Sequence, residues 1–216
     1  MLRPLFFRTL TLGACLGLRL IAPTPAAPVH EYLYVANTLG GDISVVEIPG
    51  HRVVGTIPAS VVGNDPDDVI SSRNGDVLYV SRLDTKDVIA VSTSTEQVLW
   101  RIEVGGIPNH LTLSRDERFL YVPIFDKGLL VVVDTKRHEI VARPEVGKGA
   151  HGTVLAPNGK SVYVGMMEAN QVAVVDAMRH DVQRIIPLPE GRDLGRRKRA
   201  DAERTGTAQP LPVAFQ

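Results

Sequence analysis

The chain has 216 residues, of which 44% are hydrophobic, 22% charged and 5% aromatic. This composition is typical of a packed globular protein and excludes a collagen, a wholly disordered chain and a polytopic membrane protein. The 24 basic and 24 acidic side chains balance to zero, but residues 29–190 carry the acidic excess. An acidic body disfavours nucleic acid or anionic lipid, and we expect no nucleic-acid partner.

Residues 1–28 have the organisation of an export signal, that is, a signal peptide. Arg3 and Arg8 precede an apolar run over residues 9–18, and small residues and prolines then lead to a cleavage position after Ala26. A membrane-spanning helix needs about twenty apolar residues, so this run is too short and we expect no transmembrane span. The segment therefore predicts an exported protein, periplasmic or extracellular.

The chain has a single cysteine, Cys15, which excludes a disulfide within one chain. Residues 12–15 resemble a bacterial lipoprotein cleavage box, so a lipidated Cys15 at a new N-terminus is the alternative to cleavage after Ala26. At the other end, residues 191–216 are rich in arginine and show no strand pattern. This composition predicts a disordered basic tail.

Between these ends the sequence repeats. Tyr-Val pairs begin at residues 34, 79, 121 and 163, in steps of 45, 42 and 42. A second apolar run keeps the same spacing, at residues 43–47, 88–92, 130–134 and 172–176. Self-similarity at a fixed period of 20 to 50 residues is the signature of a repeat architecture.

Each repeated segment is short, rich in Val, Ile, Thr and Tyr, and bounded by turn residues, which indicates strands. Tight-turn sequences occupy residues 72–75, 114–117 and 156–159. Four short antiparallel strands with a period near 42 are typical of a β-propeller blade. Helical periodicity long enough to cover a parallel sheet does not occur, which excludes the α/β classes.

The units resemble the YVTN-type β-propeller repeats of exported bacterial and archaeal proteins. The resemblance is carried by PNGK at residues 157–160, the Tyr-Val pair at 163–164 and VAVVD at 172–176. It extends over residues 31–189, is specific for the fold and poorly specific for function, and implies a ring that usually has seven blades.

Residues 29–190 thus form the predicted propeller domain, an all-β fold of about four blades that is incomplete relative to a seven-bladed ring. Three blades have four strands and are expected at residues 66–104, 108–146 and 150–188. Residues 31–59 supply three strands of a further blade that lacks its inner strand. The candidate for that missing strand is residues 211–215, although its proline makes it a poor one.

Three forms are open for such a chain: a closed four-bladed ring, a dimer of half-rings, or a truncated gene product. The repeat stops within a unit at residue 191, where an arginine-rich sequence begins immediately. A change of reading frame would produce this switch, so truncation is the favoured alternative.

Candidate binding residues follow from the strand order, which brings the loop before each first strand and the loop between the second and third strands to one mouth of the channel. The predicted ligand-binding residues are Asp67, Asp68, Asn109, His110, His151 and Arg82. Asp67, Asn109 and His151 occupy equivalent positions in successive blades. Carboxylate and imidazole groups can bind a polar ligand or a metal, and the sequence leaves the metal open.

Motifs of haem attachment, metalloproteases, P-loops and nucleophile elbows do not occur. We therefore expect no catalytic residues, and a binding or scaffolding module that engages a protein or small-molecule ligand. The alternative implied by the resemblance is a lactonase-like hydrolase or a redox-associated protein that holds metal or haem at the channel mouth. The cofactor is left open.

Overall fold

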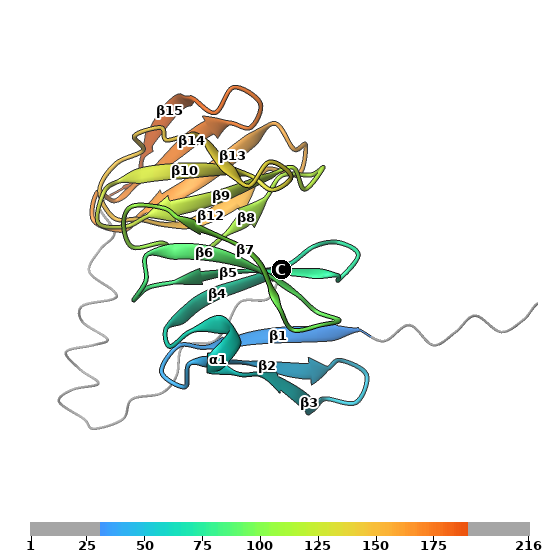
Figure 1. Cartoon of the computed structure of the whole chain (residues 1–216). Coiled ribbons are helices and arrows are strands. Elements are labelled where there is room, and N and C mark those ends of the chain that lie inside the picture. The colour runs from blue at the N-terminus through green and yellow to red at the C-terminus, as the bar shows by residue number, and fades with distance from the viewer. Residues whose placement is uncertain (1–30, 190–216) are drawn as a thin grey trace, which may run out of the picture. The chain divides into compact units, whose positions relative to one another are not determined.

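The computed structural model describes residues 31–189, which are built almost entirely from antiparallel strands (Figure 1). In each of the four sheets, neighbouring strands are hydrogen-bonded in chain order. The first sheet has three strands, β1 (Tyr32–Asn37), β2 (Asp42–Glu47) and β3 (Arg52–Ile57). The second sheet consists of β4 (Pro66–Ser71), β5 (Val77–Arg82), β6 (Asp87–Ser92) and β7 (Val98–Glu103).

The third sheet consists of β8 (Thr112–Leu113), β9 (Phe119–Ile124), β10 (Leu129–Asp134) and β11 (Glu139–Ala142). The fourth consists of β12 (Ala150–Leu155), β13 (Ser161–Met166), β14 (Gln171–Asp176) and β15 (Val182–Pro187). These sheets confirm the predicted all-β fold with four blades, the first of three strands. The predicted signal at residues 1–28, Cys15, and the tail at 191–216 with its segment 211–215 lie outside the described residues.

The turns repeat as regularly as the strands. In the predicted tight turns the fourth residue donates its backbone N–H to the carbonyl of the first, at 2.9 Å in the first two turns and 2.8 Å in the third. Two other turns recur in every sheet, one between the second and third strands and one between the third and fourth. Each of them places a residue at an equivalent position in the left-handed region of backbone conformation, where glycine and asparagine are favoured. Between the second and third strands these residues are Gly41, Lys86, Gly128 and Asn170, and between the third and fourth they are His51, Glu96, His138 and His180.

Two elements depart from the sequence prediction. The first strand of the third sheet is expected to begin at Pro108, but β8 covers only two residues, and Pro108 forms an isolated bridge with Ile124. The equivalent Pro66 begins the six-residue β4, so the missing N–H of a proline at this position does not account for the short β8. The short helix α1 (Ala59–Val62) follows β3 and is not predicted; it ends at Gly63, whose φ is 87°.

The core consists of three hydrophobic clusters, one between each pair of successive sheets. We call the side of a sheet that meets the preceding sheet its back face, and the side that meets the following sheet its front face. In the second strands, Leu78, Leu120 and Val162 lie on back faces and pack in successive clusters. The neighbouring tyrosines, Tyr79 and Tyr121, lie on front faces. Because successive side chains of a strand point to opposite faces of the sheet, the apolar residues of one blade can pack against a neighbouring blade on each side.

Candidate functional site

Five of the six predicted binding residues lie at or just before the beginning of the first strands β4, β8 and β12, where the pairing is irregular. The ladder of β4 with β5 shifts register between Pro66 and Asp68, and that of β12 with β13 shifts between Ala150 and Thr153. In the third sheet the residues between Pro108 and Thr112 leave the ladder. Bulges of this kind re-aim side chains. Sequence reasoning identified the positions but not the bulges, which the period alone does not reveal.

Hydrogen bonds connect the second sheet to the third at this end. The Asn109 side-chain Nδ2 donates to Oδ2 of Asp67 at 3.1 Å, and the backbone N–H of Leu111 donates to Oδ2 of Asp68 at 2.7 Å. The backbone N–H of Asp68 donates to the hydroxyl of Ser81 at 3.1 Å. Both carboxylates are therefore held in place by groups from the segment that leads into β8.

A histidine pair connects the third sheet to the fourth. The rings of His110 and His151 meet edge to face with their centroids 4.5 Å apart, and Phe125 lies 6.3 Å from His151. The aromatic neighbour and the close second imidazole fix the position of the His151 ring. We call Asp67, Asp68, Asn109, His110 and His151 the mouth cluster; its members come from three successive blades.

Burial perturbs the ionisation of two members of the mouth cluster, Asp68 and His151. Burial raises the pKa of Asp68, while the Leu111 N–H and His110 oppose this change. Burial lowers the pKa of His151, and His110 lowers it further, against the opposing pull of Asp67 and Asp68. His151 is consequently a neutral imidazole at neutral pH, able to accept a proton or a hydrogen bond.

The amide of Asn109 has an unused acceptor. Its Nδ2 contacts Asp67, but its Oδ1 is buried and has no hydrogen-bond partner among residues 31–189. A buried polar atom without a partner is destabilising, and a hydroxyl or water donor at this position would satisfy it.

Arg82, the sixth predicted residue, is engaged in a different contact. Its Nε and Nη2 donate to the two carboxylate oxygens of Asp87 at 2.7 and 2.6 Å, and Arg101 also contacts Asp87. Its Nη1 donates to the carbonyl of Val62 at 3.4 Å. This buried ion pair ties β5 to β6 and to α1. The five-residue spacing across the β5–β6 turn places Arg82 opposite Asp87 and so permits this pair, but the spacing does not select it without burial.

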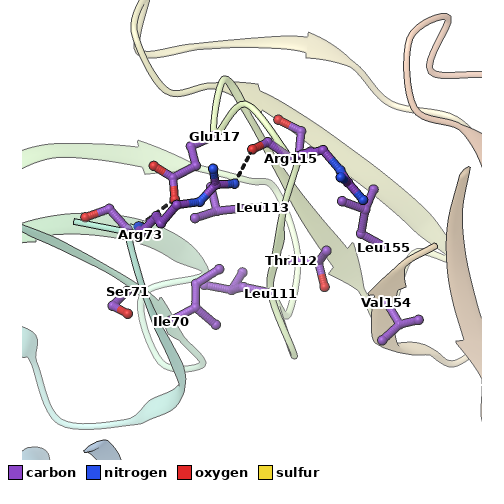
Figure 2. Close-up of a pocket in the computed structure, with 12 residues that line it drawn as sticks. Ile70, Ser71, Arg73, Leu111, Thr112, Leu113, Arg115, Glu117, Val154 and Leu155 are labelled. Carbon is purple, nitrogen blue, oxygen red and sulfur yellow. Dashed lines mark hydrogen bonds between the residues drawn. The ribbon is translucent and has the colours of Figure 1, made fainter. Parts of the chain in front are cut away.

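A groove runs along the same first strands toward their other ends (Figure 2). It encloses about 810 Å³ and is lined by residues 70–73, 111–115, 117 and 154–155. At that far end the Arg73 guanidinium donates to the carbonyl of Arg115 at 2.6 Å, and Glu117 accepts the backbone N–H of Arg73. Leu111 belongs to both regions, because its side chain lines the groove and its N–H binds Asp68.

Among residues 31–189, no three or more His, Cys, Asp or Glu side chains are arranged so that they could hold a metal ion. In the same part of the chain, no helix has the length and apolar character needed to cross a membrane.

Comparison with known proteins supports the fold. No family model matches the chain, and no match is found among the curated proteins. Among solved structures, the chain is similar to the hydrazine synthase of Kuenenia stuttgartiensis, with a TM-score of 0.66 and 22% identity over 74% of this chain and 46% of that one. It is also similar to the periplasmic gluconolactonase of Pseudomonas aeruginosa, with a TM-score of 0.59 and 22% identity over 73% of this chain and 51% of that one. The chain thus spans about half the length of these structures, and the likeness shows a β-propeller fold.

Proposed function

We propose that this chain is an exported propeller of the YVTN type, and that its mouth cluster binds a neutral, hydroxylated small molecule. The observation that carries the proposal is the convergence of five polar side chains from three blades at one end of β4, β8 and β12. Convergent polar groups beside a groove are the usual features of a ligand site.

The donor and acceptor set favours such a ligand. Two carboxylates accept hydrogen bonds from hydroxyls, His151 is neutral, and the free Oδ1 of Asn109 is ready for one further donor. Paired carboxylates repel an anion, so the sugar lactone is a better candidate than the sugar acid that it yields on hydrolysis.

The test is calorimetric titration with D-gluconolactam, a lactone analogue that does not hydrolyse, and in parallel with gluconate. We expect saturable binding of the lactam that is stronger than that of gluconate, and at least a tenfold loss of affinity in Asp67→Asn and His110→Gln. The control is His51→Asn, in a turn between a third and a fourth strand, which is expected to bind as the parent does. Binding of neither compound, or equal losses in all three variants, contradicts the proposal.

A second candidate, lactone hydrolysis, is favoured by the lowered pKa of His151. A neutral imidazole can take a proton from water as the water oxygen bonds to the lactone carbonyl carbon. The ring C–O bond then breaks, and the imidazolium returns the proton to the departing ring oxygen. Acid release from glucono-δ-lactone above the spontaneous rate, lost in His151→Gln, would support it. A rate equal to that of buffer would restrict the cluster to binding.

Two predictions about the ends of the chain remain proposals. Mass spectrometry of the mature protein distinguishes cleavage after Ala26 from a lipidated Cys15, and the full-length mass contradicts export with processing. Translating the other two reading frames beyond codon 191 tests truncation, since a continuing 42-residue repeat is then expected there.

A further inference from the structure

The interfaces between successive sheets use equivalent positions each time. On back faces, Leu78, Leu120 and Val162 all have 0% exposure. The next apolar residue of each second strand, at positions 80, 122 and 164, is also fully buried on the same face. The repeat therefore constructs one interface three times, with the front face of one sheet against the back face of the next.

The first sheet has the same back face, and no sheet within residues 31–189 precedes it. By the 45-residue step, Leu33 is equivalent to Leu78 and Val35 to Val80. Leu33 is 45% exposed and Val35 38% exposed. Val46 and Val53 complete this back face on β2 and β3, through their pairing with one another. A surface with the residues of a buried interface is thus left uncovered by the other sheets of the described part of the chain.

The last sheet has the corresponding front face, and no further sheet follows it up to residue 189, where the described residues end. Tyr163 is equivalent to Tyr79 and Tyr121, which are 7% and 0% exposed, yet Tyr163 is 38% exposed. Val154 pairs with Tyr163 and is also exposed on this face. Val172 and Val174 are the equivalents of residues 88 and 90, which pack into the interface between the second and third sheets.

We propose that the back face of the first sheet and the front face of the last sheet form a head-to-tail interface between two copies of this chain. The exposure of Leu33 and Tyr163 shows that the two faces do not cover each other within one chain. Every copy carries both faces, so two copies related by a twofold axis form two identical interfaces and close.

The size of the solved neighbours supports a second copy as the occupant. The chain covers 46% and 51% of the two similar structures, so two copies supply about as much chain as one such protein. Whatever covers Leu33 must present a front face, and whatever covers Tyr163 must present a back face. A second copy of the chain has both faces, with residues at the same positions as in the three internal interfaces. The interface does not include the mouth cluster, so it holds or fails independently of the ligand.

The experiment is sedimentation velocity on the full chain and on charged variants. We expect the parent chain to be a dimer, and Leu33→Glu and Tyr163→Lys each to be monomeric, because each substitution places one charge in both interfaces of the pair. Both side chains are exposed within one chain, so the far-ultraviolet circular dichroism of the variants is expected to match that of the parent. Leu39→Glu, in the turn between β1 and β2, is the matched control and is expected to stay dimeric.

A mixture of the two monomeric variants distinguishes head-to-tail pairing from other arrangements. In a mixed dimer one interface is wholly native and the other places the introduced glutamate opposite the introduced lysine, so we expect the dimer to return. A monomeric parent chain, open polymers, or a mixture that stays monomeric would overturn the proposal. A monomeric parent would point to further blades as the natural cover.

Discussion

Asp68 illustrates how single residues of the mouth cluster combine placement with electrostatic strain. Its carboxylate is anchored by the Leu111 N–H, but burial raises its pKa above the ordinary value of about 3.9. A raised pKa means that the folded protein disfavours the charged form. This group therefore contributes stability that is present below the unfolded pKa and is lost as the pH rises through the folded pKa.

Asp68→Asn is therefore expected to raise the free energy of unfolding at pH 7. The amide oxygen can still accept the Leu111 N–H, while the buried charge is gone. Urea unfolding at pH 7 and near pH 4 checks this, because the difference between variant and parent is expected to shrink at the lower pH. A less stable variant at pH 7 would show that the carboxylate charge is favourable there.

The pKa of His180 is shifted in the opposite direction from that of Asp68. Its ring packs edge to face on Phe119 at 4.5 Å, and burial lowers its pKa, with Asp176 opposing and Arg118 adding to the change. Stability linked to a lowered histidine pKa is complete above the unfolded value of about 6.5 and is lost as the pH falls through the folded pKa.

We expect His180→Asn to flatten the decline in stability between pH 7.5 and 5.5. Asparagine tolerates the positive φ of 59° at this position. His51→Asn, at the equivalent turn of the first sheet, reports the effect of the turn substitution itself. An unchanged slope in His180→Asn would assign the pH dependence to other groups, His151 first among them.

At the scale of the element, the turns between second and third strands show how the repeat accepts different residues at one backbone geometry. Gly41 and Gly128 suit the left-handed conformation, whereas Lys86 adopts it with a φ of 54°. A side chain there is strained by about 1–2 kcal/mol. At Gly128 an added Cβ would also lie 2.8 Å from the carbonyl oxygen of Gly147.

Two substitutions in these turns are expected to act in opposite directions. Lys86→Gly relieves strain at an exposed position and should stabilise the fold by up to about 1 kcal/mol, part of the gain being offset by the freedom of glycine in the unfolded chain. Gly128→Ala should destabilise it by about 1–3 kcal/mol through the close contact and the positive φ. Urea unfolding of both variants checks the signs; equal effects would contradict this account of the turns.

A tyrosine contact connects the third sheet to the fourth. The buried Tyr121 hydroxyl donates to the carbonyl of Ala177 at 2.9 Å. Tyr121→Phe leaves that carbonyl without its donor and should destabilise the protein by about 1–2 kcal/mol. Tyr163→Phe is the control at the equivalent position and should change stability by less than about 0.5 kcal/mol. Chemical unfolding measures both, and similar losses would show that the Ala177 contact is not responsible.

The sequence was sufficient to predict nearly every strand, because the period, the alternation and the turn residues agree four times over. It did not predict α1, which is four residues long and has no periodicity. Nor did it predict the shortening of β8, because the equivalent strand β4 has the same proline at its start and keeps six residues. Positions of the mouth cluster follow from register. The bulges that aim these residues do not, because bulges depend on which partner residue each ladder bond selects. The ion pair of Arg82 with Asp87 was not predicted, because it depends on burial that spacing alone leaves open.

At the scale of the whole molecule, stability is a sum of neighbouring contacts between sheets. Among residues 31–189, the second and third sheets have a hydrophobic cluster on each face, whereas the first and fourth sheets have a cluster on one face. Contacts in such arrays reach only the adjacent unit, so the end sheets open with less free energy than the middle ones.

Hydrogen exchange is expected to follow this order. In the Leu33→Glu chain, whose end faces stay uncovered, amides of β6 and β10 should exchange about tenfold or more slowly than equivalent amides of β2 and β14. These four strands all have hydrogen-bonded neighbours on both sides, so a difference in exchange between them reports whether the faces of their sheets are covered by another sheet. Equal protection in all four would indicate a single cooperative unit.

The constancy of register between sheets has an evolutionary consequence. Because every blade presents the same front positions to the same back positions, a 42-residue unit can be copied or lost without altering any contact inside a blade. Duplication or deletion of whole units in the gene can therefore change the number of blades in the protein, while each remaining blade folds as before. Innovation is then concentrated at the starts of the first strands, where Asp67, Asn109 and His151 show that equivalent positions have already diverged in chemistry.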